Sequence, residues 1–278
     1  MWKKNILWGL MIIKICHKTS YFFEDTVPSL IQTLKLYPTI CKNQKVLDWK
    51  ITSNKGAIID SYQDSLGHKI INIYIKNLKG KQEIKSEGRI QTRNSFGTFL
   101  GLLEKVNPLC FLRYTHLTYP GKNIINLSKK IKKISNLIEF CHDLNLLVSD
   151  AICYKSNTTN NNTSAEMALE KGKGVCQDYA HILISLSRFF KLPARYINGY
   201  LIEEENTKEY FTHAWVEIFI IDLGWVAFDP SHKISINEKY VRISCGYDFI
   251  DASPIRGVKL NYRGSEELSY KVNINSNQ

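Results

Sequence analysis

The stretch that decides the fold is "GKGVCQDYAH", residues 172–181, in which two glycines precede a lone cysteine. The apolar periodicity that follows predicts a helix that begins near Cys176 and ends before Pro193. A helix N-terminus carries free N–H groups and the positive end of the dipole, which together favour a thiolate and suit an oxyanion. Cys176 is therefore a candidate nucleophile. A packed thiol is the alternative, because free cysteines are among the most buried residue types.

Two runs further along the chain supply partners for this thiol. The alternation in "THAWVEIFII", residues 212–221, places His213 and Trp215 on the face opposite the aliphatic residues. A tight "DLG" turn leads to "GWVAFDP", and antiparallel pairing of the two runs can bring His213 beside Asp229. A carboxylate there would orient the imidazole and favour the imidazolium. The order Cys176, His213, Asp229 predicts a nucleophile, a base and an orienting acid.

These residues lie in recognisable motifs. The runs "GKGVCQDYAHILISLSRFFKLPARYINGYL", "THAWVEIFI" and "GWVAFDPSH" resemble the three core motifs of the transglutaminase-like superfamily. The tail "VRISCGYDFIDASPIRGVKLNYRG" is similar to the C-terminal segment of its bacterial branch, and "ICHKTSYFFEDTVP" resembles the start of that branch's N-terminal region. The resemblance implies a catalytic triad of Cys176, His213 and Asp229, and no cofactor or metal.

The fold class that follows is α+β. The resemblance implies a papain-like catalytic core, in which the helix that carries the nucleophile packs on an antiparallel sheet, preceded by a β-sandwich-like N-terminal domain. We expect a β-rich domain over residues 11–95, a connector over 96–125 and the catalytic domain over 126–278. Alternation in the first of these predicts an inward strand face with Ile13, Ile15, His17, Thr19, Tyr21 and Phe23. Residues 1–10 form an extension, and Met11 is an alternative start.

Three further residues are predicted to contact substrate: Gln177 as a hydrogen-bond donor in the first helical turn, Trp215 as an aromatic wall, and Tyr200 after Gly199. Core packing is the alternative for both aromatic residues. His181 lies one turn beyond the thiol and is expected to be structural. His142 lacks a second pair of ligands, which argues against a metal site.

The formal net charge of +11 raises the question of a nucleic-acid partner. In "LSKKIKKISNLIEFC" the lysines alternate with apolar residues at helical spacing, so we expect a helix over residues 126–147 with a solvated basic face. Nucleic acid is therefore not an expected partner. The first apolar run is far shorter than a membrane span, which argues against membrane insertion.

The seven cysteines are scattered and include no C-x-x-C pair. This pattern predicts reduced thiols and a cytoplasmic location, with export by the short N-terminal apolar segment as the alternative.

The function expected from these residues is acyl transfer from a peptide or protein substrate through a thioester. Water as acceptor gives a cysteine peptidase or amidase, which is our prediction. An amine acceptor gives a transglutaminase, and a non-catalytic peptide-binding module on the same fold is the third reading. The sequence predicts neither the substrate's identity nor the oligomeric state.

Overall fold

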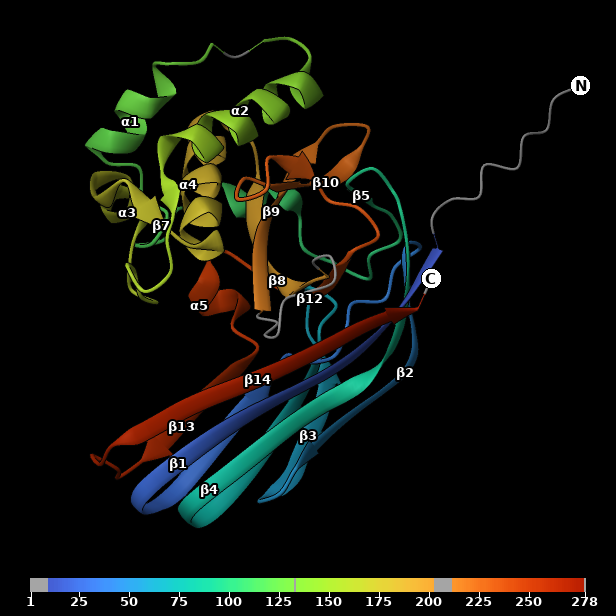
Figure 1. The fold of residues 1–278 in the computed structure, drawn as a ribbon, viewed down its shortest axis with the longest axis vertical. Coiled ribbons are helices and arrows are strands. Elements are labelled where there is room, and N and C mark those ends of the chain that lie inside the picture. The colour runs from blue at the N-terminus through green and yellow to red at the C-terminus, as the bar shows by residue number, and fades with distance from the viewer. Residues whose placement is uncertain (1–9, 133, 203–211, 278) are drawn as a thin grey trace, which may run out of the picture.

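The computed structural model describes residues 10–132, 134–202 and 212–277, which form two lobes (Figure 1). Each lobe is built on a six-stranded antiparallel sheet. One sheet consists of long strands without helices on it, and the other is covered by the helices of the chain. The combination confirms the α+β class.

The first sheet is built on two strands of 25 residues, β1 (Leu10–Leu34) and β4 (Lys69–Arg93), which pair along their length. Strands β2 (Gln44–Ser53) and β3 (Ala57–Gln63) pair with β4, whereas β13 (Ile255–Leu260) and β14 (Glu266–Asn277) pair with β1. The register shifts between Phe23 and Val27, where both long strands turn back on themselves (Figure 1). The sheet is thereby doubled, and a buried hydrogen bond from Gln82 to Gln32 joins its two layers. This arrangement agrees with the sandwich-like domain expected from the sequence.

The inward face predicted for the first strand is confirmed, because Ile13, Ile15, His17, Thr19, Tyr21 and Phe23 are all buried. The domain boundaries need a correction. The sequence assigned residues 126–278 to the catalytic domain, yet β13 and β14 join the first sheet. Val272 and Ile274 of β14 pack with Ile13 and Ile15 of β1, and this shared apolar core holds the C-terminal strand on the N-terminal lobe.

The second sheet has the strand order β11 (Ile234–Ser235), β10 (Gly224–Asp229), β9 (Thr212–Ile220), β8 (Ala194–Leu201), β12 (Tyr240–Gly246). Helix α4 (Cys176–Phe189) packs on one face through buried aliphatic side chains such as Ile182 and Leu186. Around it lie α1 (Lys122–Ser128), α2 (Leu137–Ala151), α3 (Ala165–Lys171) and α5 (Phe249–Ala252). The short parallel pair β6 (Cys153–Tyr154) and β7 (Lys173–Gly174) leads into α4.

Two expectations for the middle of the chain were wrong. The single helix predicted over residues 126–147 is two helices, α1 and α2. The side chain of Asn136 accepts a hydrogen bond from the Glu139 N–H, so a new N-cap opens α2 where a continuous helix was expected. The predicted connector also contributes to the second sheet, because β5 (Thr98–Phe99) pairs with β10, and a 3₁₀ turn (Pro108–Leu112) follows.

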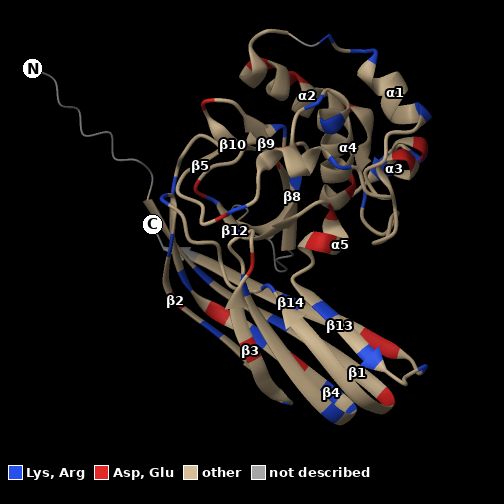
Figure 2. Ribbon diagram, turned by 180° about the vertical axis from the view of Figure 1, so that it is seen from behind, with Lys and Arg blue, Asp and Glu red and all other residues tan. Residues whose placement is uncertain are grey.

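Basic and acidic positions are interspersed over both lobes (Figure 2). The described lysines that follow α1, at positions 129, 130 and 132, are exposed, as a solvated basic segment requires. Among the described residues, no helix has both the length and the apolar content needed to cross a membrane.

Candidate active site

Helix α4 begins at Cys176, and Val175 is its N-cap in extended conformation. Asp178 secures this end, because its carboxylate accepts hydrogen bonds from the Val175 N–H at 2.8 Å and from the Thr159 hydroxyl at 2.7 Å. A Cβ atom on Gly174 would lie 2.7 Å from the Asp178 side chain, so the cap requires a glycine there. The backbone N–H groups of Cys176 and Gln177 start the helix and have no carbonyl in a preceding turn. They are therefore available to an oxyanion.

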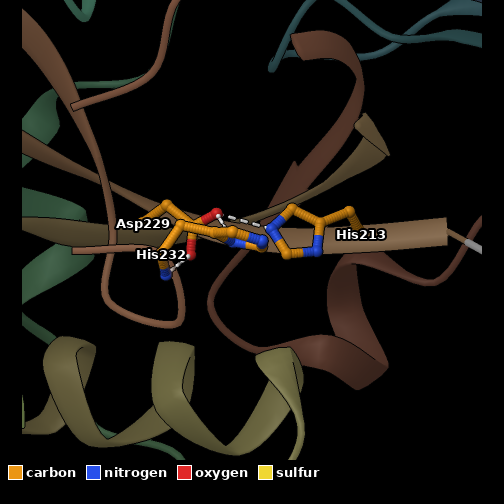
Figure 3. Close-up of side chains that lie close together, drawn as sticks. All are labelled: His213, Asp229 and His232. Atoms are coloured by element: carbon orange, nitrogen blue, oxygen red, sulfur yellow. Dashed lines mark hydrogen bonds and ion pairs between the residues drawn. The ribbon is translucent and has the colours of Figure 1, made fainter. Parts of the chain in front are cut away.

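Strands β9 and β10 bring the other two predicted residues together. Phe228 lies opposite Val216, so Asp229 lies diagonally across from His213. The His213 Nε2 and Asp229 Oδ2 atoms are 2.6 Å apart, and both side chains are nearly or fully buried (Figure 3). This register has the parity that the sequence required for an imidazole–carboxylate pair.

Asp229 accepts several hydrogen bonds besides that from His213. The Tyr240 hydroxyl and His232 Nδ1 reach the same carboxylate oxygen, at 2.8 and 2.9 Å, while the Ser231 hydroxyl and N–H reach the other. Burial alone would raise the pKa of Asp229, but His213 and His232 hold that pKa well below its usual range. The carboxylate therefore stays ionised throughout the range in which the site would operate.

His213 lies between this carboxylate and the thiol of Cys176. Burial would lower the pKa of the imidazole, yet the Cys176 sulfur and Asp229, each hydrogen-bonded to the ring, raise that pKa to about 10. The imidazolium form is thus favoured at neutral pH. An imidazolium beside a sulfur atom at a helix N-terminus is the arrangement in which a cysteine attacks carbonyl carbon.

A pocket of about 450 Å³ opens at this point, between the two lobes. Cys176, which is partly exposed, and His213 form part of its floor, so a substrate carbonyl can reach the sulfur. Strands β1 and β14 of the first sheet contribute the opposite wall through residues such as His17 and Tyr270.

The structure separates the three residues that were predicted to contact substrate. Gln177 lines the pocket. Trp215 is fully buried behind His213 and packs edge-to-face on Tyr240. Tyr200 is also buried, and its hydroxyl meets His17 Nδ1 at 2.8 Å. Both aromatic residues are therefore packed in the core, which was the alternative to substrate contact. Each lies between elements whose arrangement the sequence could not predict.

His181 is structural, as expected, since it is buried and its Nε2 accepts the Phe249 N–H. Three further residues that contact Asp229, namely Tyr240, His232 and Ser231, were not predicted from the sequence. His232 belongs to the quoted "FDPSH" motif, and its distance of three residues from Asp229 was an available signal. Tyr240 lies on β12, two strands away from β9 in the sheet, and no local pattern identified it.

Among the described residues, His213, Asp229 and His232 also form a group whose ligand atoms lie within 4.8 Å of one another (Figure 3). Both ring nitrogens that face Asp229 meet the same carboxylate oxygen, which also accepts the Tyr240 hydroxyl. Each imidazole is thus hydrogen-bonded to the Asp229 carboxylate.

Comparisons with known proteins match both halves of the chain. Residues 125–230 match the transglutaminase-like superfamily, and residues 13–91 match the bacterial transglutaminase-like N-terminal region. An uncharacterized protein of Mycobacterium leprae is 33% identical, with 94% of this chain and 98% of that protein covered. An uncharacterized protein of Mycobacterium tuberculosis is 28% identical over 148 residues, half of this chain and 46% of that one.

A solved structure shares the fold. It is that of a protein from Cytophaga hutchinsonii, provisionally described as a cysteine protease, with a TM-score of 0.77 at 20% identity. The match covers 96% of this chain and 91% of that one, so both lobes are included.

Proposed function

This chain belongs to the transglutaminase-like superfamily, and from that premise we propose that it is a cysteine peptidase or amidase that cleaves a peptide or amide bond. The observation that carries the proposal is the line of contacts from the Cys176 sulfur through the His213 ring to the Asp229 carboxylate, at the floor of an open pocket. The provisional description of the Cytophaga hutchinsonii protein as a cysteine protease is consistent with it.

In the first half of the reaction, the Cys176 sulfur attacks the substrate carbonyl carbon and the carbonyl electron pair moves to oxygen. The N–H groups at the start of α4 stabilise this oxyanion. The C–N bond then breaks, and the proton on His213 passes to the departing amine. The product of this half is an acyl-thioester on Cys176 with a neutral imidazole beside it.

In the second half, His213 takes a proton from water as the water oxygen attacks the thioester. The C–S bond breaks, the acid leaves, and the proton on the imidazole restores the starting pair. Asp229 remains ionised in both halves and keeps the ring in position. An amine that replaced water would turn the same intermediate into a transglutaminase product.

Mass spectrometry after brief iodoacetamide treatment between pH 5 and 8 tests the reactive pair. We expect selective alkylation of Cys176 at the low end of this range, because the His213 imidazolium supports a thiolate. His213→Ala should remove that selectivity while the other cysteines react as before. Labelling of Cys176 at the rate of the exposed Cys110 and Cys153 in both proteins would contradict the proposal and favour the binding module.

A peptide substrate incubated with and without a primary amine then identifies the acceptor. A free carboxylate in the presence of amine identifies a hydrolase. Incorporation of the amine identifies a transglutaminase.

A further inference from the structure

The pocket at Cys176 has one wall from each lobe. The catalytic lobe contributes Cys176, Gln177, Tyr196 and Asn198, while the first sheet contributes side chains of β1 and β14. Figure 1 shows β14 along the edge of the first sheet that faces the catalytic lobe. A substrate that reaches the sulfur must therefore also contact the N-terminal lobe.

The described residues that line this pocket include no aspartate, glutamate, lysine or arginine. Its two titratable imidazoles belong to His213, which the triad uses, and His17, which it does not. Burial lowers the pKa of His17 to about 4, so the β1 wall is neutral at physiological pH. Apart from the Cys176–His213 pair, the described lining therefore offers no charge to pair with a charged substrate side chain, which would lose its water shell on entry.

Apolar surface is exposed on the β14 wall. Along one face of this strand, Val272 and Ile274 are buried against the catalytic lobe, at 3% and 1% exposure. Nearer the start of β14 the same face reaches the pocket, where Tyr270 and Leu268 are 53% and 57% exposed. The strand thus continues its apolar pattern into the pocket, where both side chains keep about half of their surface exposed.

Asn198 offers a polar anchor on the other side. Its side chain is 7% exposed and lines the pocket, and the amide makes no hydrogen bond to another described residue. A substrate peptide group could satisfy both the donor and the acceptor of this amide.

We propose that this pocket selects a substrate segment with an apolar or aromatic side chain close to the reactive carbonyl. That side chain packs on Leu268 and Tyr270 of the N-terminal lobe, and Asn198 hydrogen-bonds the main chain of the segment. The inference rests on the proposed function of Cys176 and adds the substrate class. It also gives the N-terminal lobe a role in specificity.

The test uses peptidyl acyloxymethyl ketones that alkylate thiols and differ only in the side chain beside the reactive carbonyl: Phe, Gln, Glu or Lys. Each labelling rate of Cys176 is divided by the rate with iodoacetamide, which has no side chain to recognise. We expect the Phe probe to exceed the Glu and Lys probes by about tenfold or more on this scale.

Two variants of the same residue type provide the matched control. Leu268→Glu should slow the Phe probe about tenfold more than it slows iodoacetamide. Leu260→Glu alters a leucine that is also about half exposed on a strand paired with β1, but lies outside the pocket, so it should alter neither rate. Asn198→Ala should slow all four peptidyl probes to a similar extent, since it removes a main-chain contact.

Different results would overturn the proposed function and the substrate preference. Unselective iodoacetamide labelling of Cys176 would overturn the proposed function. Selective iodoacetamide labelling with equal rates for the four peptidyl probes, or an equal effect of Leu268→Glu and Leu260→Glu, would overturn the inference alone. A preference for the Gln probe would identify a glutamine site instead and would also overturn it.

Discussion

Two sets of cysteine, histidine and aspartate with similar contacts occur among the described residues. The first is the site described above, and the second is formed by Cys245 on β12 with His68 and Asp64. In the second set His68 Nδ1 lies 2.8 Å from the Asp64 carboxylate, and His68 Nε2 lies 3.4 Å from the Cys245 sulfur.

The electrostatic surroundings of Cys245 are those expected of a reactive thiol. Burial alone would raise the pKa of Cys245, but the nearby guanidinium groups of Arg242 and Arg195, together with His68, lower it to about 7. A lowered thiol pKa is one property expected of a nucleophile. By this criterion the second set would qualify as an active site.

Access and hydrogen-bond direction do distinguish them. Cys245 is fully buried near the end of β12, whereas Cys176 starts a helix at the floor of a pocket. The backbone N–H of Cys245 donates to His68 Nε2, so that nitrogen accepts a hydrogen bond and cannot hold a proton for a leaving group. A nucleophile requires a free path to carbon and a base with a free proton position, which residue types alone do not supply.

Replacement of each cysteine tests this distinction with the largest expected effect. Cys176→Ala should reduce turnover of a cleavable peptide by about 10⁴-fold or more, because no other described thiol reaches the pocket. Cys245→Ala should leave turnover within about twofold and lower stability by about 1–3 kcal/mol, as expected for a change in a packed core. Steady-state kinetics and urea unfolding measure the two effects. Loss of turnover in folded Cys245→Ala protein would assign a catalytic role to the second set.

Replacement of each aspartate should give the next largest difference. Asp229→Asn removes the charge that helps to keep His213 protonated, so alkylation of Cys176 at pH 6 should slow about 100-fold. Asp64→Asn should leave that rate unchanged, since Asp64 acts on His68 and the turn before it. Timed labelling with mass spectrometry measures both variants. Equal rates in Asp229→Asn and the unmodified protein would separate Asp229 from the reactivity of the thiol.

A smaller effect concerns the proton on His213. Its pKa is raised to about 10, and removal of the sulfur by Cys176→Ala should lower it, because a negative sulfur favours the charged ring. The imidazolium should then be lost at a lower pH than in the unmodified protein. NMR titration of the ring protons follows the change. His181, whose pKa burial lowers to about 4, is the internal reference and should not shift. An unchanged His213 titration would mean that the two groups do not interact.

The sequence was informative where function depends on local geometry. The helix start at Cys176 was predicted from residue order within a short segment and is confirmed, and the register of β9 and β10 has the parity on which the His213–Asp229 pair depended. Local geometry was not sufficient for Trp215 and Tyr200, the two aromatic residues that were expected to contact substrate. Which face of a strand meets substrate depends on how the lobes pack, and the C-terminal β14, which joins the N-terminal sheet, could not be placed from its own residues.

Tyr240 shows the same limit within the site. It lies 11 residues beyond Asp229 on a strand that reaches the carboxylate only through the order of the second sheet. The other contacts of Asp229 come from residues adjacent in sequence, Ser231 and His232, or from the register of one hairpin. A donor supplied by a non-adjacent strand becomes visible only in the folded protein.

Tyr240→Phe has the smallest expected effect and tests whether this distant donor matters. Asp229 keeps its contacts with His213, His232 and Ser231, so labelling of Cys176 should slow only about fivefold, the consequence of one lost hydrogen bond of about 1 kcal/mol. Tyr179→Phe is the matched control, because its buried hydroxyl donates to the Ile152 carbonyl away from the triad. Both variants should lose similar stability in urea unfolding. If both also slow labelling equally, Tyr240 acts through the fold and not through Asp229. If only Tyr240→Phe slows labelling of Cys176, the Tyr240 hydroxyl on β12 positions the Asp229 carboxylate for His213.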